Sequence, residues 1–124
     1  VDPNHVLDQL EEQPALYAYW STLAEEAAIV AEVARRRLDF VEAELDAEVR
    51  DDARDEGKKT TEDGVKRAIV RKNKYQDALD QMLETRRDAA VLGVMRRSLE
   101  QRLSALIAVN NRDRSEMAAT GRDS

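Results

Sequence analysis

Residues 20–49 read WSTLAEEAAIVAEVARRRLDFVEAELDAEV, and their apolar positions decide the fold. These positions follow one another at gaps of three or four residues: Trp20, Leu23, Ala27, Val30, Ala34, Leu38, Val41, Leu45 and Val49. Such spacing places them on one face of an α-helix. Because no Gly or Pro interrupts residues 15–56, we predict one long helix over 14–55. At 1.5 Å per residue it would extend roughly 60 Å, which is typical of a coiled-coil or hairpin arm.

A second long helix is predicted over residues 74–110. Apart from the interval between Met82 and Leu92, its apolar positions also recur at gaps of three or four: Tyr75, Leu79, Met82, Leu83, Leu92, Met95, Leu99, Leu103, Leu106 and Val109. Between the two long helices, the stretch TTED at residues 60–63 indicates a helix start, with Thr60 as the capping residue of a short helix over 61–72. Strand signals are absent, so the sequence predicts an all-α fold, a long antiparallel helical hairpin with a short connecting helix.

The two ends of the chain are predicted to differ. Asp2 and Pro3 form a good helix start, which indicates a short helix over 3–12 that ends before Pro14. Residues 111–124 are polar and contain Gly121, which predicts a partly disordered tail. The expected organisation is a single helical domain over 1–110 followed by this tail.

The core of a lone chain would be thin. The hydrophobic content is 42%, but much of it is alanine, and aromatic residues make up only 4%. Alanine buries little area, and burial stabilises by ~25 cal/mol per Å² of apolar surface. We therefore expect a homo-oligomer. Its interface is predicted on the C-terminal helix at Leu99, Leu103, Leu106 and Ile107.

Charge is distributed unevenly along the chain. Residues 1–56 are strongly acidic, whereas residues 57–74 (GKKTTEDGVKRAIVRKNK) hold seven bases and two acids. A short basic segment of this kind favours a polyanion partner, through phosphate contacts by Lys58, Lys59, Lys66, Arg67, Arg71, Lys72 and Lys74. Tyr75 follows directly and could stack on a base. The alternative is that these cations neutralise the acidic residues 39–56 within the fold.

A second basic island is Arg35-Arg36-Arg37, inside an otherwise acidic helix. These arginines are candidates for nucleic-acid binding. Alternatively, they pair with Glu32 and Asp39 at helical spacing, or they lie in a protein interface.

Several chemistries are missing from the sequence. The chain has no Cys and a single His, which excludes thiolate metal sites, and no pattern of catalytic residues or phosphate-binding glycines is present. We expect neither an enzyme nor a bound cofactor or metal. No apolar run approaches the ~20 residues that span a bilayer, so no membrane partner is expected either.

Several anchors resemble phage recombination mediators of the UvsY type. They are Tyr17-x-x-Trp20 followed by Leu23, Glu32-Val33 before the arginine cluster, Arg37-Leu38-Asp39-Phe40, and an arginine-rich end from Ile107 to Glu116. The resemblance implies a helical, ring-like homo-oligomer that binds single-stranded DNA and helps to load a recombinase in the cytoplasm of a bacterial host cell. It also implies that Arg35, Arg36 and Arg37 contact the DNA.

The rival hypothesis is a non-enzymatic structural or adaptor subunit of a phage or other assembly. In that case the arginines would form ion pairs between proteins.

Overall fold

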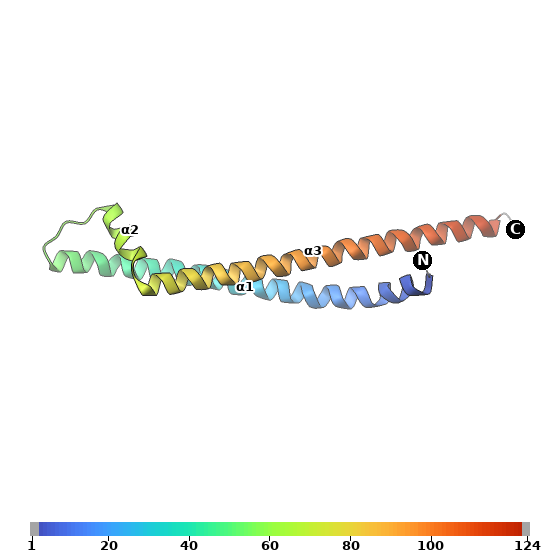
Figure 1. Cartoon of the computed structure of the whole chain (residues 1–124), viewed down its shortest axis with the longest axis horizontal. Coiled ribbons are helices and arrows are strands. Elements are labelled where there is room, and N and C mark those ends of the chain that lie inside the picture. The colour runs from blue at the N-terminus through green and yellow to red at the C-terminus, as the bar shows by residue number, and fades with distance from the viewer. Residues whose placement is uncertain (1–2, 123–124) are drawn as a thin grey trace. The chain divides into compact units, whose positions relative to one another are not determined.

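A computed structural model describes residues 3–122, and every regular element within them is an α-helix. The helices are α1 (Pro3–Asp55), α2 (Glu62–Val70) and α3 (Asn73–Arg122) (Figure 1). The helices α1 and α3 pack against each other, and the short α2 lies between them in the sequence. The predicted all-α hairpin with a connecting helix is therefore confirmed.

The predicted break before Pro14 is wrong, because α1 continues through this residue as one helix from Pro3. Proline removes one backbone N–H from the helical ladder and crowds the preceding turn, which bends a helix more readily than it ends one. The first turns of α1, dark blue in Figure 1, bend away from the line of the turns that follow. The side chain of Gln13, just before the proline, is buried, so packing extends to this part of the helix.

A glycine ends α1 where the sequence predicted. The backbone N–H of Lys58 donates to Ala53 O at 2.8 Å, and that of Gly57 donates to Arg54 O at 3.0 Å. This pair of bonds is the Schellman motif, which requires a left-handed residue at the position after the cap. Gly57 supplies it with a φ of +70°.

The short helix α2 begins one residue later than predicted, and its cap is Thr61 instead of Thr60. The Thr61 hydroxyl accepts a hydrogen bond from the backbone N–H of Gly64 at 3.1 Å. Both threonines suit a cap, and the extended backbone of Thr61 (φ −112°, ψ 156°) selects it. The helix also ends earlier, at Val70, and α3 follows after two residues.

The predicted disordered tail is wrong for residues 111–122, which continue α3. Between Gly93 and Gly121 the chain has no Gly or Pro, and Ala, Arg, Glu and Met favour helix even without an apolar face. Near the end of α3 the Thr120 hydroxyl donates to Glu116 O at 2.9 Å, as helical geometry allows.

The chain divides into two compact units. We call Glu26–Ala89 the central unit, and Val1–Glu25 with Ala90–Ser124 the terminal unit. The single-domain organisation stays a prediction. In the central unit the buried cluster draws on all three helices: Leu38, Val41 and Leu45 from α1, Val65 and Ile69 from α2, and Ala78 from α3. Val41 is fully buried, whereas Val30, predicted on the same face, is more than half exposed.

The terminal unit has a thinner interior. Ala24 and Gln13 are its buried residues among the side chains that the structure describes. Tyr19 and Trp20 meet edge to face, with ring centroids 5.4 Å apart. The large apolar side chains of the unit that the structure describes, such as Trp20, Leu92 and Leu99, are only half-buried, so the unit has a thin interior.

Candidate nucleic-acid interface

The outer face of α2 carries a cluster of exposed cations. Lys66, Arg67 and Arg71 line a shallow depression of about 290 Å³ together with the half-exposed Val70. Within residues 3–122 no ion pair involves these three cations. Their charges therefore face solvent. We call Lys66, Arg67 and Arg71 the α2 basic face.

The amphipathic pattern of α2 creates this face. Val65 and Ile69, four residues apart, are buried in the central core and fix the rotation of the helix. Positions one and two residues after each of them then point outward, and Lys66, Arg67 and Arg71 occupy three of these positions. Lys59 is also exposed, in the loop that precedes α2.

Three other predicted phosphate ligands are held by carboxylates of the same chain. Lys74 Nζ lies 2.9 Å from Glu44 Oε1, and Lys72 Nζ lies 3.5 Å from Glu48 Oε1. Lys58 Nζ lies 3.0 Å from Glu56 Oε2. For these lysines the structure has the arrangement that the alternative described, in which the basic segment neutralises the acidic end of α1.

Two of the three consecutive arginines are paired within α1. Arg35 Nη2 lies 2.8 Å from Glu32 Oε1 and its Nη1 lies 3.8 Å from Asp39, while Arg36 Nε lies 3.4 Å from Glu32 Oε1. The hydrogen bond and the charge of Arg35 lower the pKa of Glu32. The same hydrogen bond and charge of Glu32 raise the pKa of Arg35.

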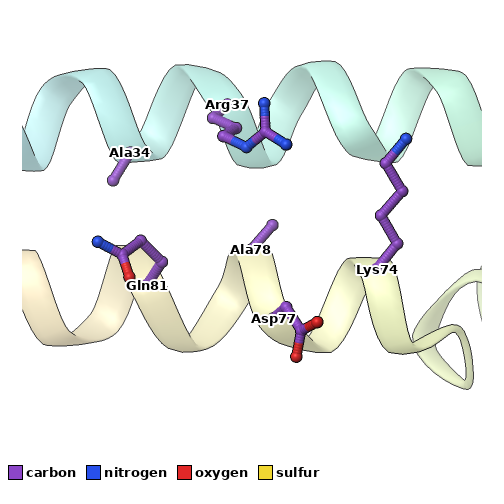
Figure 2. Close-up of a pocket in the computed structure, with 6 residues that line it drawn as sticks. All are labelled: Ala34, Arg37, Lys74, Asp77, Ala78 and Gln81. Carbon is purple, nitrogen blue, oxygen red and sulfur yellow. The ribbon is translucent and has the colours of Figure 1, made fainter.

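Arg37 lies on a different side of α1 and lines a cavity shared with α3. This cavity of about 200 Å³ is also lined by Lys74, and the other walls are Ala34, Asp77, Ala78 and Gln81. Figure 2 shows Lys74 extending from α3 toward α1, whereas the Asp77 carboxylate points away from α1. The fold thus brings together two predicted DNA ligands, Arg37 and Lys74, that are far apart in the sequence.

Tyr75 is half-buried and packs against the central core cluster. Its ring therefore contributes to folding, and only part of it is exposed for stacking on a base.

The predicted interface residues lie on α3 in the terminal unit. Leu99, Leu103 and Leu106 are half-buried, and Ile107 is 46% exposed. The sequence prediction missed a second group of exposed apolar residues on α1: Ile29, Val33 and Phe40. Their spacing of four and seven residues was a signal that could have identified them.

Among residues 3–122, no cluster of three or more His, Asp or Glu side chains is arranged to hold a metal ion. None of the described helices has an apolar stretch that could cross a membrane. Comparisons with known protein families, with curated proteins and with solved structures found no match to this chain.

Proposed function

We propose that this protein is a non-enzymatic recombination mediator that binds single-stranded DNA as a homo-oligomer, in the cytoplasm of a bacterial host cell. The observation that carries the proposal is the α2 basic face. Lys66, Arg67 and Arg71 are exposed, close together and without a carboxylate partner in the described chain. Lys and Arg side chains in such a group neutralise backbone phosphates and release counterions.

The acidic charge on α1 favours contact with DNA at α2. A surface of α1 lined by Asp39, Glu42 and Asp46 is acidic and would repel a phosphate backbone. A nucleic acid would accordingly meet the chain at α2. Phosphate contacts carry no sequence information, so the binding would tolerate any sequence.

The net charge of −6 makes each contact weak, and an oligomer would compensate for this. Several α2 basic faces on one assembly would contact one strand together, and the avidity would exceed the affinity of a single copy. We also propose that the protein helps to load a recombinase, because its sequence resembles mediators of the UvsY type.

The test compares two triple variants that lose the same charge. Lys66→Gln/Arg67→Gln/Arg71→Gln removes the α2 basic face, and Lys58→Gln/Lys72→Gln/Lys74→Gln removes three cations that are paired within the chain. Binding of fluorescent oligo(dT) is measured by anisotropy over a salt series. The slope of log K against log[salt] should fall by about 2 in the first variant, at ~0.7 per phosphate contact, and by much less in the second.

A flat salt dependence in the unmodified protein would eliminate the phosphate mechanism. Equal loss of binding in both variants would show that overall charge matters and the α2 basic face does not. If DNA binding holds, release of a labelled single-strand-binding protein from DNA tests the mediator step.

A structural or adaptor subunit is the second candidate. The observation that favours it is the pairing of Lys58, Lys72 and Lys74 with carboxylates of the same chain, which leaves fewer free cations. The substitution Arg35→Ala/Arg36→Ala/Arg37→Ala separates the candidates. Loss of self-association in a chain that binds no DNA would favour the adaptor, whereas DNA binding that persists through the α2 basic face would favour the mediator.

A further inference from the structure

A second apolar stripe runs along α1 on the side that the central core does not cover. Ile29, Val33 and Phe40 are 64%, 60% and 63% exposed. At 100° per residue the three fall within about 40° of arc around the helix. Val41, next to Phe40, is fully buried on the other side. The helix therefore has one apolar face inside the central unit and another that faces solvent.

The exposed stripe has the spacing of a coiled-coil seam. Its positions follow one another at gaps of four, three, four, three and four: Ile29, Val33, Arg36, Phe40, Ala43 and Ala47. All six are exposed. Strict alternation of three and four is the heptad pattern, which suits a left-handed supercoil with another helix. The buried face of α1 departs from strict alternation, and it packs within the chain.

We infer that this stripe, from Ile29 to Ala47, is the surface on which a second copy of the chain docks, with the two α1 helices parallel and in register. The inference extends the proposed function, because this surface would form the oligomer that gives avidity for DNA. That link to DNA rests on the proposed function. It places the self-association surface on α1, away from the α3 leucines.

One complementary pair, Glu32 with Arg37, favours a second copy in the parallel direction. In a parallel pair, the residue just before Val33, Phe40 or Ala47 faces the residue five positions further along the partner helix. Glu32 would then face Arg37 of the other copy, and Arg37 has no ion pair within residues 3–122. The next two pairs, Asp39 with Glu44 and Asp46 with Asp51, are acidic on both sides, but Glu44, Asp46 and Asp51 each pair with a base of their own chain: Lys74, Arg50 and Arg54. Glu32 also pairs with Arg35 and Arg36 of its own chain, so Arg37 is the cation that gains a partner in the dimer.

An antiparallel pair is disfavoured by the same residues. It would set the flank that contains Glu32, Asp39 and Asp46 against the identical flank of the partner, so that acid would face acid. Arg36 occupies one seam position, and its side chain is 76% exposed. A single charged seam residue costs stability and fixes the register.

The first experiment measures self-association without DNA, by sedimentation velocity over a range of concentrations. The unmodified chain should be a dimer or larger, and Val33→Asp or Phe40→Asp should weaken association about tenfold or more. Leu103→Asp on α3 is the matched control and should have a smaller effect. Circular dichroism of each variant checks that the helices remain. A monomer at tens of micromolar, or association that Phe40→Asp leaves unchanged, would overturn the inference.

A second experiment tests the parallel register. The chain contains no cysteine, so Ala43→Cys provides a single reporter. In register, Ala43→Cys should form a disulfide with itself across the dimer, whereas Ala105→Cys on α3 should not. Glu32→Arg and Arg37→Glu should each weaken the dimer, and the double exchange should restore it. Absence of both the cross-link and the rescue would exclude the parallel arrangement.

These outcomes are separate from those of the proposed function. A monomeric Phe40→Asp variant keeps the α2 basic face intact, so its residual salt-dependent DNA binding reports on that face alone. If the dimer forms but does not bind DNA, the mediator proposal is wrong, whereas the proposed docking surface on α1 is unaffected.

Discussion

Lys74 Nζ lies 2.9 Å from Glu44 Oε1, and this contact joins α3 to α1 across 30 residues of sequence. Lys72 and Glu48 make the neighbouring contact at 3.5 Å. Lys72 lies just before α3, so both contacts hold the start of α3 against the second half of α1. Further along, Ala34 lies near Ala78 and Ala28 lies near Ala89, so the residue number falls along α1 as it rises along α3, which is the signature of antiparallel helices. The same two lysines are also predicted phosphate ligands. Their side chains therefore have a role in the hairpin itself, apart from any role in DNA binding.

A double-mutant cycle on Lys74 and Glu44 should give a small coupling. Both side chains are about half exposed, so the expected coupling free energy is ~0.2–1 kcal/mol at low salt. The measurement is urea unfolding of Lys74→Ala, Glu44→Ala and the double variant. The coupling should shrink as ionic strength rises, because salt screens exposed pairs. A coupling that did not change with salt would indicate that the contact acts through packing.

Substitution of each of two adjacent threonines should show which one caps α2. Thr61→Ala should destabilise the protein by about 1 kcal/mol, since the backbone N–H of Gly64 loses its acceptor. Thr60→Ala is the matched control and should change the free energy of unfolding by less than about 0.5 kcal/mol. Chemical denaturation of both variants decides between the observed cap and the one predicted from the sequence. A larger effect at Thr60 would contradict the observed cap.

The long helices could be predicted because their apolar residues recur at helical spacing over many turns. The helix ends were harder to predict. Pro14 suits the start of a new helix, but proline can bend a helix without ending it, and α1 continues through this residue. Residues 111–122 have no apolar face, yet nothing in them breaks a helix before Gly121. Val30 fits the inner spacing but lies outside the buried arc.

The candidate site was only partly predictable. The local spacing of Lys66, Arg67 and Arg71 on α2 could be derived, because Val65 and Ile69 mark the inner side of that helix. That Arg37 and Lys74 line one cavity could not be derived, since it depends on the register between α1 and α3. That register follows from the turn at Gly57 and from packing across the hairpin, neither of which appears in a helical repeat.

Two glycine substitutions should have opposite signs. Gly57→Ala should destabilise by about 1 kcal/mol, because a side chain at φ +70° is strained even though the space around it is open. Gly93→Ala should stabilise by up to about 1 kcal/mol, because it lies inside α3 and the added methyl group would meet only Arg97 Nη1, at 3.8 Å. Thermal unfolding of the two variants measures this contrast. Destabilisation at Gly93 would mean that another group occupies the space beside it.

The pKa of Glu32 should depend on Arg35. The hydrogen bond and charge of Arg35 lower the pKa of Glu32 below its usual value near 4.5, and Arg36 adds to this effect. Arg35→Ala should raise the pKa of Glu32 toward that value, as measured by NMR titration of the side-chain carboxyl. Arg54→Ala, which removes a partner of Asp51, is the control and should leave Glu32 unchanged.

The sign of the pH effect follows from the lowered pKa. The folded state binds a proton at Glu32 less readily than the unfolded state does, so the pair stabilises the fold above pH 4.5. This contribution is lost as the pH falls through the folded pKa. The acid-induced loss of stability should therefore be smaller in Arg35→Ala than in the unmodified chain. An identical acid profile would show that the pair does not contribute to stability.

Leu45→Ala should locate the main source of stability in the central unit. Leu45 is 3% exposed and belongs to the core cluster, so its truncation should cost about 2–5 kcal/mol. Leu83→Ala is the matched control, since Leu83 is half-exposed on α3, and should cost less than about 1 kcal/mol. Urea unfolding should be measured at two protein concentrations, because self-association adds to apparent stability. If both variants lost the same stability and the loss varied with concentration, the stability would come from association between copies and not from the small core that α1, α2 and α3 share.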